Sequence, residues 1–199
     1  MIRSKVRYTM KNPDAFLRVN VISEYINAIG SLRTFMYQSK EDYYHLKWSI
    51  IAAHISLQTL MVIALKGTSN LEVIKWDKKK YTNKTQYEIL SDPKAKLDSF
   101  LDLFSKIVRK GYLNNSEISH EVDDITTSIT LLNDIRNQFI HFLPATWSIQ
   151  VDLLKEVLLS TIKVQKVLLK HCSKATYCFD DLDPNFIIDL LEECEKHLI

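Results

Sequence analysis

The residue types that could do chemistry in this chain gather in one stretch, residues 131–144. Arg136, Asn137 and His141 occur there within six positions, and Asn133 precedes Asn137 by four. At about 100° per residue, Asn133, Asn137 and His141 would form one ridge of a helix, and Arg136 would lie beside that ridge with the reach to join it. A cation, an amide and a titratable imidazole would then point the same way near a helix end. Such a group suits a phosphate oxyanion better than it suits a core.

The same stretch has the pattern of an amphipathic helix. Four apolar residues share the face opposite the polar ridge: Leu131, Ile135, Phe139 and Phe142. The helix is expected to end near Leu143, because the residue before Pro144 is pushed out of the α region. Ile129 and Ile140 interrupt the polar ridge, so we expect the ridge to lie in a groove or a subunit interface rather than in open water.

The composition favours a helical protein of the reducing cytoplasm. The 199 residues suffice for one domain with a real core, and three glycines and four prolines argue against a sandwich, a barrel or a sheet with glycine-rich nucleotide loops. A net charge of +2 does not by itself indicate nucleic-acid binding, so any contact with RNA must come from a local patch. The three cysteines form no CxxC pair, and residues 1–7 lack the apolar core of a signal peptide.

Apolar residues recur at helical spacing along most of the chain. Six helical stretches are predicted, at residues 12–38, 42–66, 92–111, 116–143, 151–171 and 183–198. Asn12-Pro13, Asp92-Pro93 and Asp183-Pro184 have the form of helix starts, and Ser116 or Ser119 could cap the helix with the polar ridge. The predicted fold is all-α: a single antiparallel bundle of about six helices over residues 1–199, with room for an insertion at 71–94.

The second helix is apolar nearly all round. Residues 48–65 carry no charge and barely reach the length of a membrane span, but His54 and three other polar residues interrupt them. We interpret this helix as the buried centre of the bundle and expect no membrane partner. His54 is predicted to be a hydrogen-bonded core residue rather than a catalyst.

Residues 71–94 combine basic and aromatic side chains. Lys78, Lys79, Lys80 and Tyr81 lie together there, with Trp76, Lys84 and Tyr87 nearby. Such interleaving can hold single-stranded RNA by charge and stacking. The alternative is a solvated excursion between helices.

Other kinds of site find little support. Cys172, Cys178 and Cys194, with His171 and His197, offer zinc-ligand chemistry but lack paired short spacings, so no metal site is predicted. Glycine-rich phosphate loops, a nucleophile elbow and an HExxH motif are absent, which argues against the common hydrolase and kinase classes. No cofactor is expected.

Arg136-Asn137, three further residues and then His141 near a helix end resemble the signature of the HEPN superfamily. The long apolar hairpin upstream and the helix behind are similar to its bundle, and the continuation through Pro144 to Trp147-Ser148 resembles a bacterial branch. The resemblance implies a homodimer that joins two motifs in one cleft and cuts RNA without metal, the ribose 2′-hydroxyl attacking the neighbouring phosphate.

The resemblance also implies roles for single residues. His141 would be a general acid or base, Arg136 would bind the phosphate and stabilise its growing charge, and Asn137 would orient one of them. The setting would be a bacterial toxin–antitoxin, phage-defence or stress system, with an antitoxin or sensor protein as partner. One toxin branch has an antitoxin-modified tyrosine two positions after the histidine; Leu143 stands there, so we do not expect that control.

Two alternatives need no catalysis. The chain could be a HEPN-like helical module that binds a nucleotide, RNA or a protein, or an unrelated helical adaptor. In the simplest structural interpretation, Arg136 pairs with Asp134 or another acid, and His141 closes the helix C-terminus, where a cation is favoured.

Overall fold

The computed structural model describes residues 19–67, 69–141, 146–172 and 183–198. Eight α-helices lie in these ranges: α1 (Val21–Gln38), α2 (His45–Leu65), α3 (Lys78–Tyr81), α4 (Gln86–Leu90), α5 (Phe100–Arg109), α6 (Val122–Ile140), α7 (Val151–Cys172) and α8 (Pro184–Glu195). Two 3-10 helices, η1 (Leu71–Val73) and η2 (Ser119–Glu121), complete the regular structure. Within the described ranges no strand forms, so the prediction of an all-helical fold is confirmed there.

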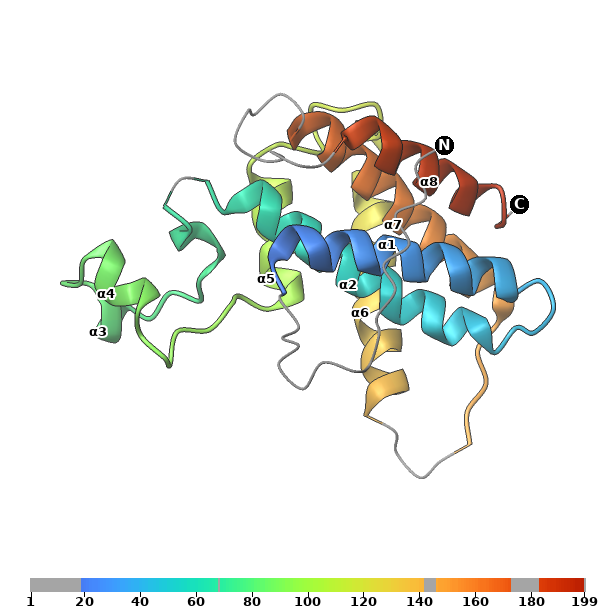
Figure 1. The fold of residues 1–199 in the computed structure, drawn as a ribbon, viewed down its shortest axis with the longest axis horizontal. Helices are drawn as coiled ribbons and strands as arrows, with labels where there is room; N and C mark the ends of the chain where they lie inside the picture. The colour runs from blue at the N-terminus through green and yellow to red at the C-terminus, as the bar shows by residue number, and fades with distance from the viewer. Residues whose placement is uncertain (1–18, 68, 142–145, 173–182, 199) are drawn as a thin grey trace, which may run out of the picture.

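α2 lies at the centre of the bundle and contacts α1, α5, α6 and α7 (Figure 1). Thirteen of its 21 residues are buried, and they lie on all sides of the helix. Among the described helices, α2 is also the one that is long and apolar enough to cross a membrane by length and composition. The prediction of a buried central helix is confirmed, because about two thirds of the apolar window is enclosed by the other helices.

The C-terminal helix α8 packs against α1 and α7. Arg33 of α1 forms an ion pair with Glu193 (2.6 Å), and Lys166 of α7 forms one with Glu195 (3.0 Å). Asp183 caps α8 by accepting a hydrogen bond from the backbone N–H of Asn185 (2.9 Å). The predicted Asp-Pro start of this helix is therefore confirmed.

The start of the first helix differs from the prediction. α1 begins after Asn20, whose side chain accepts a hydrogen bond from the N–H of Ser23 (2.8 Å), while the Ser23 hydroxyl accepts one from the N–H of Asn20 (3.0 Å). This reciprocal capping box satisfies two N–H groups that would otherwise lack partners. The predicted start at Asn12-Pro13 lies outside the described residues.

Two further helix starts were predicted wrongly. α5 begins after Ser99, which accepts a hydrogen bond from the N–H of Asp102 (3.2 Å); Asp92 instead accepts one from the N–H of Lys94 (2.9 Å) and so closes a turn. Neither Ser116 nor Ser119 caps α6, because that helix follows directly on η2 and Glu121 precedes it without a side-chain cap.

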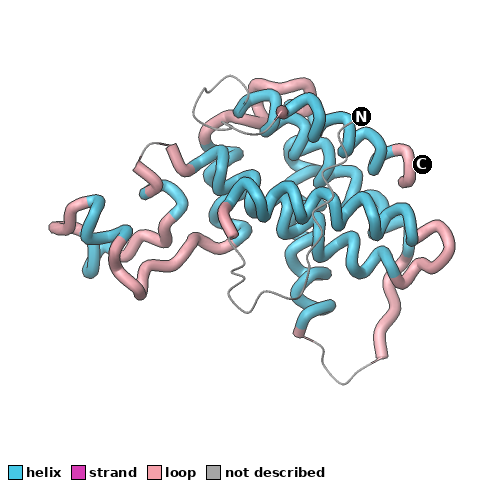
Figure 2. The backbone as a smooth tube through the Cα atoms, viewed as in Figure 1, coloured by secondary structure: helices cyan, strands magenta, loops and turns pink. Residues whose placement is uncertain are grey.

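Between α2 and α5 the chain leaves the bundle as a projecting lobe (Figure 1), which we call the lysine lobe (residues 71–98). Its short helices α3 and α4 are joined by loops (Figure 2). An isolated antiparallel bridge between Ile74 and Leu97 closes its base, and the N–H of Asp98 donates to the carbonyl of Val73 (2.9 Å). Asp98 also pairs with Lys106 of α5, which attaches the lobe to the bundle.

The central position of α2 makes its core residues costly to truncate. Leu57→Ala is expected to lower the free energy of unfolding by about 2–5 kcal/mol, because Leu57 is fully enclosed. The partly exposed Leu101 of α5 supplies the control, and Leu101→Ala should cost clearly less. Urea denaturation followed by circular dichroism measures both. Equal losses would contradict the central placement of α2.

Candidate functional site

The residues of the predicted motif lie in the last turns of α6. Arg136 and Asn137 are half-buried, and His141 is exposed at the position that follows the helix. The backbone N–H of His141 donates to the carbonyl of Asn137 (2.8 Å), which joins the two residues across one turn. This end of α6 extends past α1 and α2 in Figure 1. The expected end near Leu143 and Pro144 lies outside the described residues, and α6 ends at Ile140.

Arg136 is oriented by its neighbour rather than by an acid. Its Nη1 donates to Oδ1 of Asn137 (3.0 Å), and no described carboxylate forms an ion pair with it. Asp134, one of the acids that the structural alternative would pair with Arg136, instead accepts a hydrogen bond from the Asn133 amide (3.4 Å). The Nε of Arg136 is enclosed and has no hydrogen-bond partner among the described residues. A guanidinium has five N–H donors, and the hydrogen bond to Asn137 engages one of them.

His54 of α2 faces these α6 residues from inside the bundle. Only 3% of its surface is exposed, and its ring stacks on Phe100 with the centroids 4.0 Å apart. Burial, and to a lesser extent the charge of Arg136, lowers the pKa of His54 to about 4 against the opposing effect of the Asn133 side chain. His54 is thus held neutral beside the arginine of the motif.

The prediction for His54 is confirmed in part. The residue is buried as expected, but neither ring nitrogen has a hydrogen bond of normal geometry to a described residue. The approach of Arg136 and Asn133 to this ring was missed. The sequence did draw attention to His54, because it is an isolated histidine in an otherwise apolar helix. The residues of α6 that face it could not be identified from the sequence around it.

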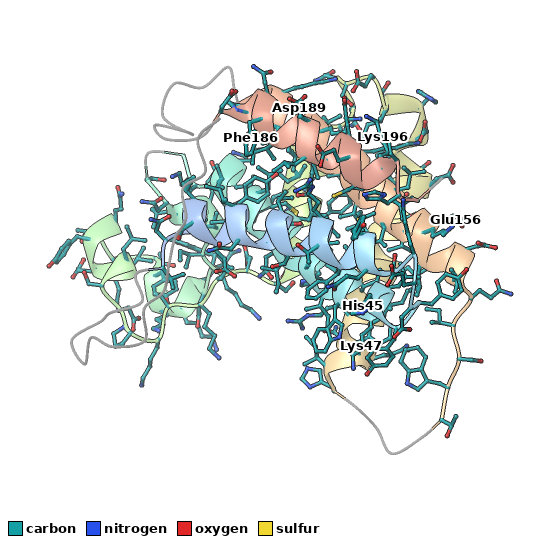
Figure 3. The ribbon with its side chains drawn as sticks, turned by 45° about the vertical axis from the view of Figure 1, so that its right-hand side comes forward. His45, Lys47, Glu156, Phe186, Asp189 and Lys196 are labelled. Carbon is teal, nitrogen blue, oxygen red and sulfur yellow. The ribbon has the colours of Figure 1, made fainter. Side chains whose placement is uncertain are left out.

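An aromatic cleft lies beside the end of α6. It holds about 530 Å³, and its walls include Tyr43, Tyr44, Lys47, Phe139, Trp147 and Leu154. The ring centroids of Phe139 and Trp147 are 5.2 Å apart, and the Nζ of Lys47 lies 5.9 Å from the Phe139 centroid. Lys47 lies near the start of α2, beside the C-terminal part of α6 (Figure 3). The cleft thus offers flat apolar rings and a cation next to the motif.

The basic residues singled out in the sequence lie elsewhere. Lys78, Lys79, Lys80 and Tyr81 form α3 on the lysine lobe, apart from the end of α6 (Figure 1). The three lysines reach the surface to different degrees, whereas Tyr81 is only 2% exposed. The structure therefore does not join these residues to the α6 motif in one site.

The cysteines form no metal site within the described residues, where no cluster of three histidine, cysteine or acidic side chains could hold an ion. Cys194 is enclosed in α8, and burial raises the pKa of its thiol to about 12. Cys178 lies outside the described residues.

Comparison with known proteins finds no family model, no curated protein and no solved structure that matches this chain.

The buried neutral His54 should make stability depend on pH. The pKa of His54 is about 4 in the folded chain against an ordinary value of 6.5. As the pH falls from 6.5 towards 4, His54 therefore becomes protonated in the unfolded chain while it stays neutral in the folded chain. The free energy of unfolding should drop over this window, by roughly 3 kcal/mol in total from this group. Urea denaturation at several pH values measures the drop.

His54→Gln isolates the effect, because the variant keeps the other histidines but loses this titration. Its stability should fall less steeply between pH 6.5 and 4 than that of the wild type. Parallel curves for the two proteins would show that His54 titrates normally in the folded chain.

Proposed function

We propose that this chain is a metal-independent endoribonuclease of the HEPN type, acting as a homodimer with Arg136, Asn137 and His141 of both copies at a shared cleft. One observation carries the proposal: a guanidinium oriented by an amide and without a described acidic partner lies five residues before an exposed imidazole. A cation with donors to spare and a nearby proton carrier are what phosphodiester cleavage by an internal hydroxyl needs.

The chemistry follows from these groups. The ribose 2′-oxygen attacks the adjacent phosphorus, its proton passes to one His141, and the bond to the 5′-oxygen breaks as a proton is supplied to that oxygen. In a dimer the His141 of the partner can give this second proton. The Arg136 guanidinium stabilises the extra negative charge on the phosphoryl oxygens, and Asn137 keeps the guanidinium in place. The products are a 2′,3′-cyclic phosphate and a 5′-hydroxyl.

Exposed apolar residues around the end of α6 support the dimer. Ile140, the residue before His141, is exposed, as are Tyr43, Tyr44 and Trp147 at the aromatic cleft. Aromatic residues are enriched in protein interfaces, and a group of them at one place is unusual on a monomer. A second copy seated here would bring two α6 ends together.

The biological setting that we propose is a bacterial toxin–antitoxin, phage-defence or stress system in the cytoplasm. An RNA-cutting protein needs control, so an antitoxin or sensor protein is the expected partner. Growth arrest on expression in bacteria, relieved by His141→Ala, would fit this setting.

A second candidate function is a non-catalytic HEPN-like module that binds RNA, a nucleotide or a protein. The enclosed Nε of Arg136 and its approach to buried His54 favour it, because both tie the arginine to the bundle. Under this function, changes at Arg136 weaken binding but no RNA fragments appear.

Cleavage of total RNA in the presence of EDTA tests the enzyme. His141→Ala should slow cutting by about 10²–10⁴-fold, the usual effect of losing a general acid or base. Arg136→Lys should also slow cutting, because a lysine keeps the charge but loses the planar set of donors. Gel analysis of fragments gives the rates.

The matched control is His120→Ala, since His120 is an exposed histidine beyond the opposite end of α6. It should cut like the wild type. Absence of metal-independent cutting by the wild type, or equal cutting by the His141 and His120 variants, would refute the catalytic proposal.

The dimer has its own prediction. Sedimentation velocity of the wild type at micromolar concentration should give a dimer, and Ile140→Glu should shift it to monomer by placing a charge in the apolar contact. Phe186→Glu changes an exposed apolar residue on α8 and should leave the dimer intact. A monomeric wild type would contradict the shared cleft.

A further inference from the structure

The lysine lobe contains a groove of about 420 Å³, a volume within the range of ligand sites. Its walls include five lysines and one exposed indole: Lys75, Lys78, Lys80, Lys94, Lys96 and Trp76. The one acidic residue in the wall, Asp77, accepts hydrogen bonds from the backbone N–H groups of Lys79 (3.0 Å) and Lys80 (3.3 Å). Its carboxylate is thus engaged in capping α3.

Most of these lysines have no acidic partner. Lys80 forms an ion pair with Asp92 (2.6 Å), but Lys75, Lys78, Lys94 and Lys96 form none with the described residues. Residues 75–96 hold seven lysines against three acids, a net charge of +4 in a chain whose total is +2. The rest of the chain therefore sums to −2, and the positive charge of the protein is concentrated here.

The fold assembles the groove from two separate segments. The backbone N–H of Lys75 donates to the carbonyl of Lys96 (2.8 Å), beside the bridge between Ile74 and Leu97. Lysines 21 positions apart are thereby fixed side by side, and the Lys106–Asp98 pair ties this base to α5. Side chains on such a base lose less entropy on binding than those of a free loop would.

Trp76 adds an aromatic surface to the lysines. Half of its surface (50%) is exposed, and its ring centroid lies 5.7 Å from that of Tyr81, with the planes 51° apart. Tyr81 is buried and packs against the indole, so Trp76 supplies the exposed aromatic face. An indole face beside several unpaired ammonium groups matches a base next to its phosphates.

We infer that this groove is a binding site for single-stranded nucleic acid, with Lys75, Lys78, Lys94 and Lys96 on the phosphates and Trp76 stacked on a base. The concave wall and the single indole favour a strand over a flat anionic surface. The site stands apart from the α6 motif, so binding here does not require that the motif be catalytic.

Binding of a labelled 12-nucleotide single-stranded DNA, followed by fluorescence anisotropy, tests the site. This probe lacks the 2′-hydroxyl and cannot be cut by the proposed mechanism, so failure of binding and failure of cleavage are separate results. Trp76→Ala should weaken binding by roughly 5- to 150-fold, the range for loss of one stacked base. Tyr87→Ala is the control, because Tyr87 is a 79% exposed ring of the same lobe that does not line the groove.

Salt dependence tests the lysines. Lys75→Gln together with Lys96→Gln should reduce the slope of log K against log salt by about 1.4, since each phosphate contact to a single strand contributes about 0.7. Lys40→Gln with Lys196→Gln removes the same charge from exposed positions outside the lobe and should leave the slope unchanged.

Either of two results would overturn the site. One is equal affinity for wild type and both groove variants. The other is an equal fall in slope for the Lys40/Lys196 pair, which would mean that charge alone matters. Loss with the lysine variant but not with Trp76→Ala would restrict the ligand to phosphates and refute base stacking. Thermal melts confirm that each variant is folded.

Discussion

A helix that is apolar on all sides must be covered on all sides, and the fold of this chain is built around that requirement. α1, α5, α6 and α7 all contact α2, and most of the large enclosed side chains belong to these helices. The helices that cover α2 also enclose polar groups that would be better solvated in water. His54 loses its access to solvent and remains neutral, which removes the repulsion that a second cation would exert on nearby Arg136. The covering of α2 therefore determines the charge state beside the candidate site.

The same requirement explains why the candidate site lies at a helix end. The inner turns of α6 bury Ile125, Ile129 and Leu132 against the bundle, so they have no room for a substrate. At the end of α6, His141 reaches solvent while Arg136, five residues earlier, is still half enclosed. The Arg136 guanidinium is therefore held in place by the bundle, whereas the His141 imidazole at the edge of the bundle is accessible to solvent.

The long helices could be predicted from the sequence because most have an apolar period and α2 is a long apolar run, but several helix starts could not. The capping box at Asn20 and the cap at Ser99 depend on single side chains, and the Asp92-Pro93 pair imitated a helix start while forming a turn. The helical wheel of α6 showed that Ile129 and Ile140 interrupt the polar ridge, but it could not show which of the two the bundle would bury. α6 packs against both α2 and α7, so Ile129 on the presumed polar ridge is fully enclosed and Arg136 is half enclosed. The pairing of Lys75 with Lys96 could not be predicted from any local sequence pattern, because it depends on a backbone bridge between two separate segments.

The two proposed sites differ in the range of their action. The lysine lobe concentrates positive charge, but at physiological salt its attraction falls off over about 8 Å, so it can hold a strand without drawing it towards α6. The α6 end has one oriented cation, an exposed imidazole and aromatic rings, which suit contact with a single phosphate rather than capture of a polyanion. Should both proposals hold, a strand long enough to contact both would gain from two tethered contacts, because the second forms at the high effective concentration that the first creates. Substrate length would then matter more to cutting than base sequence, since lysines on phosphates and one indole on a base discriminate little between sequences.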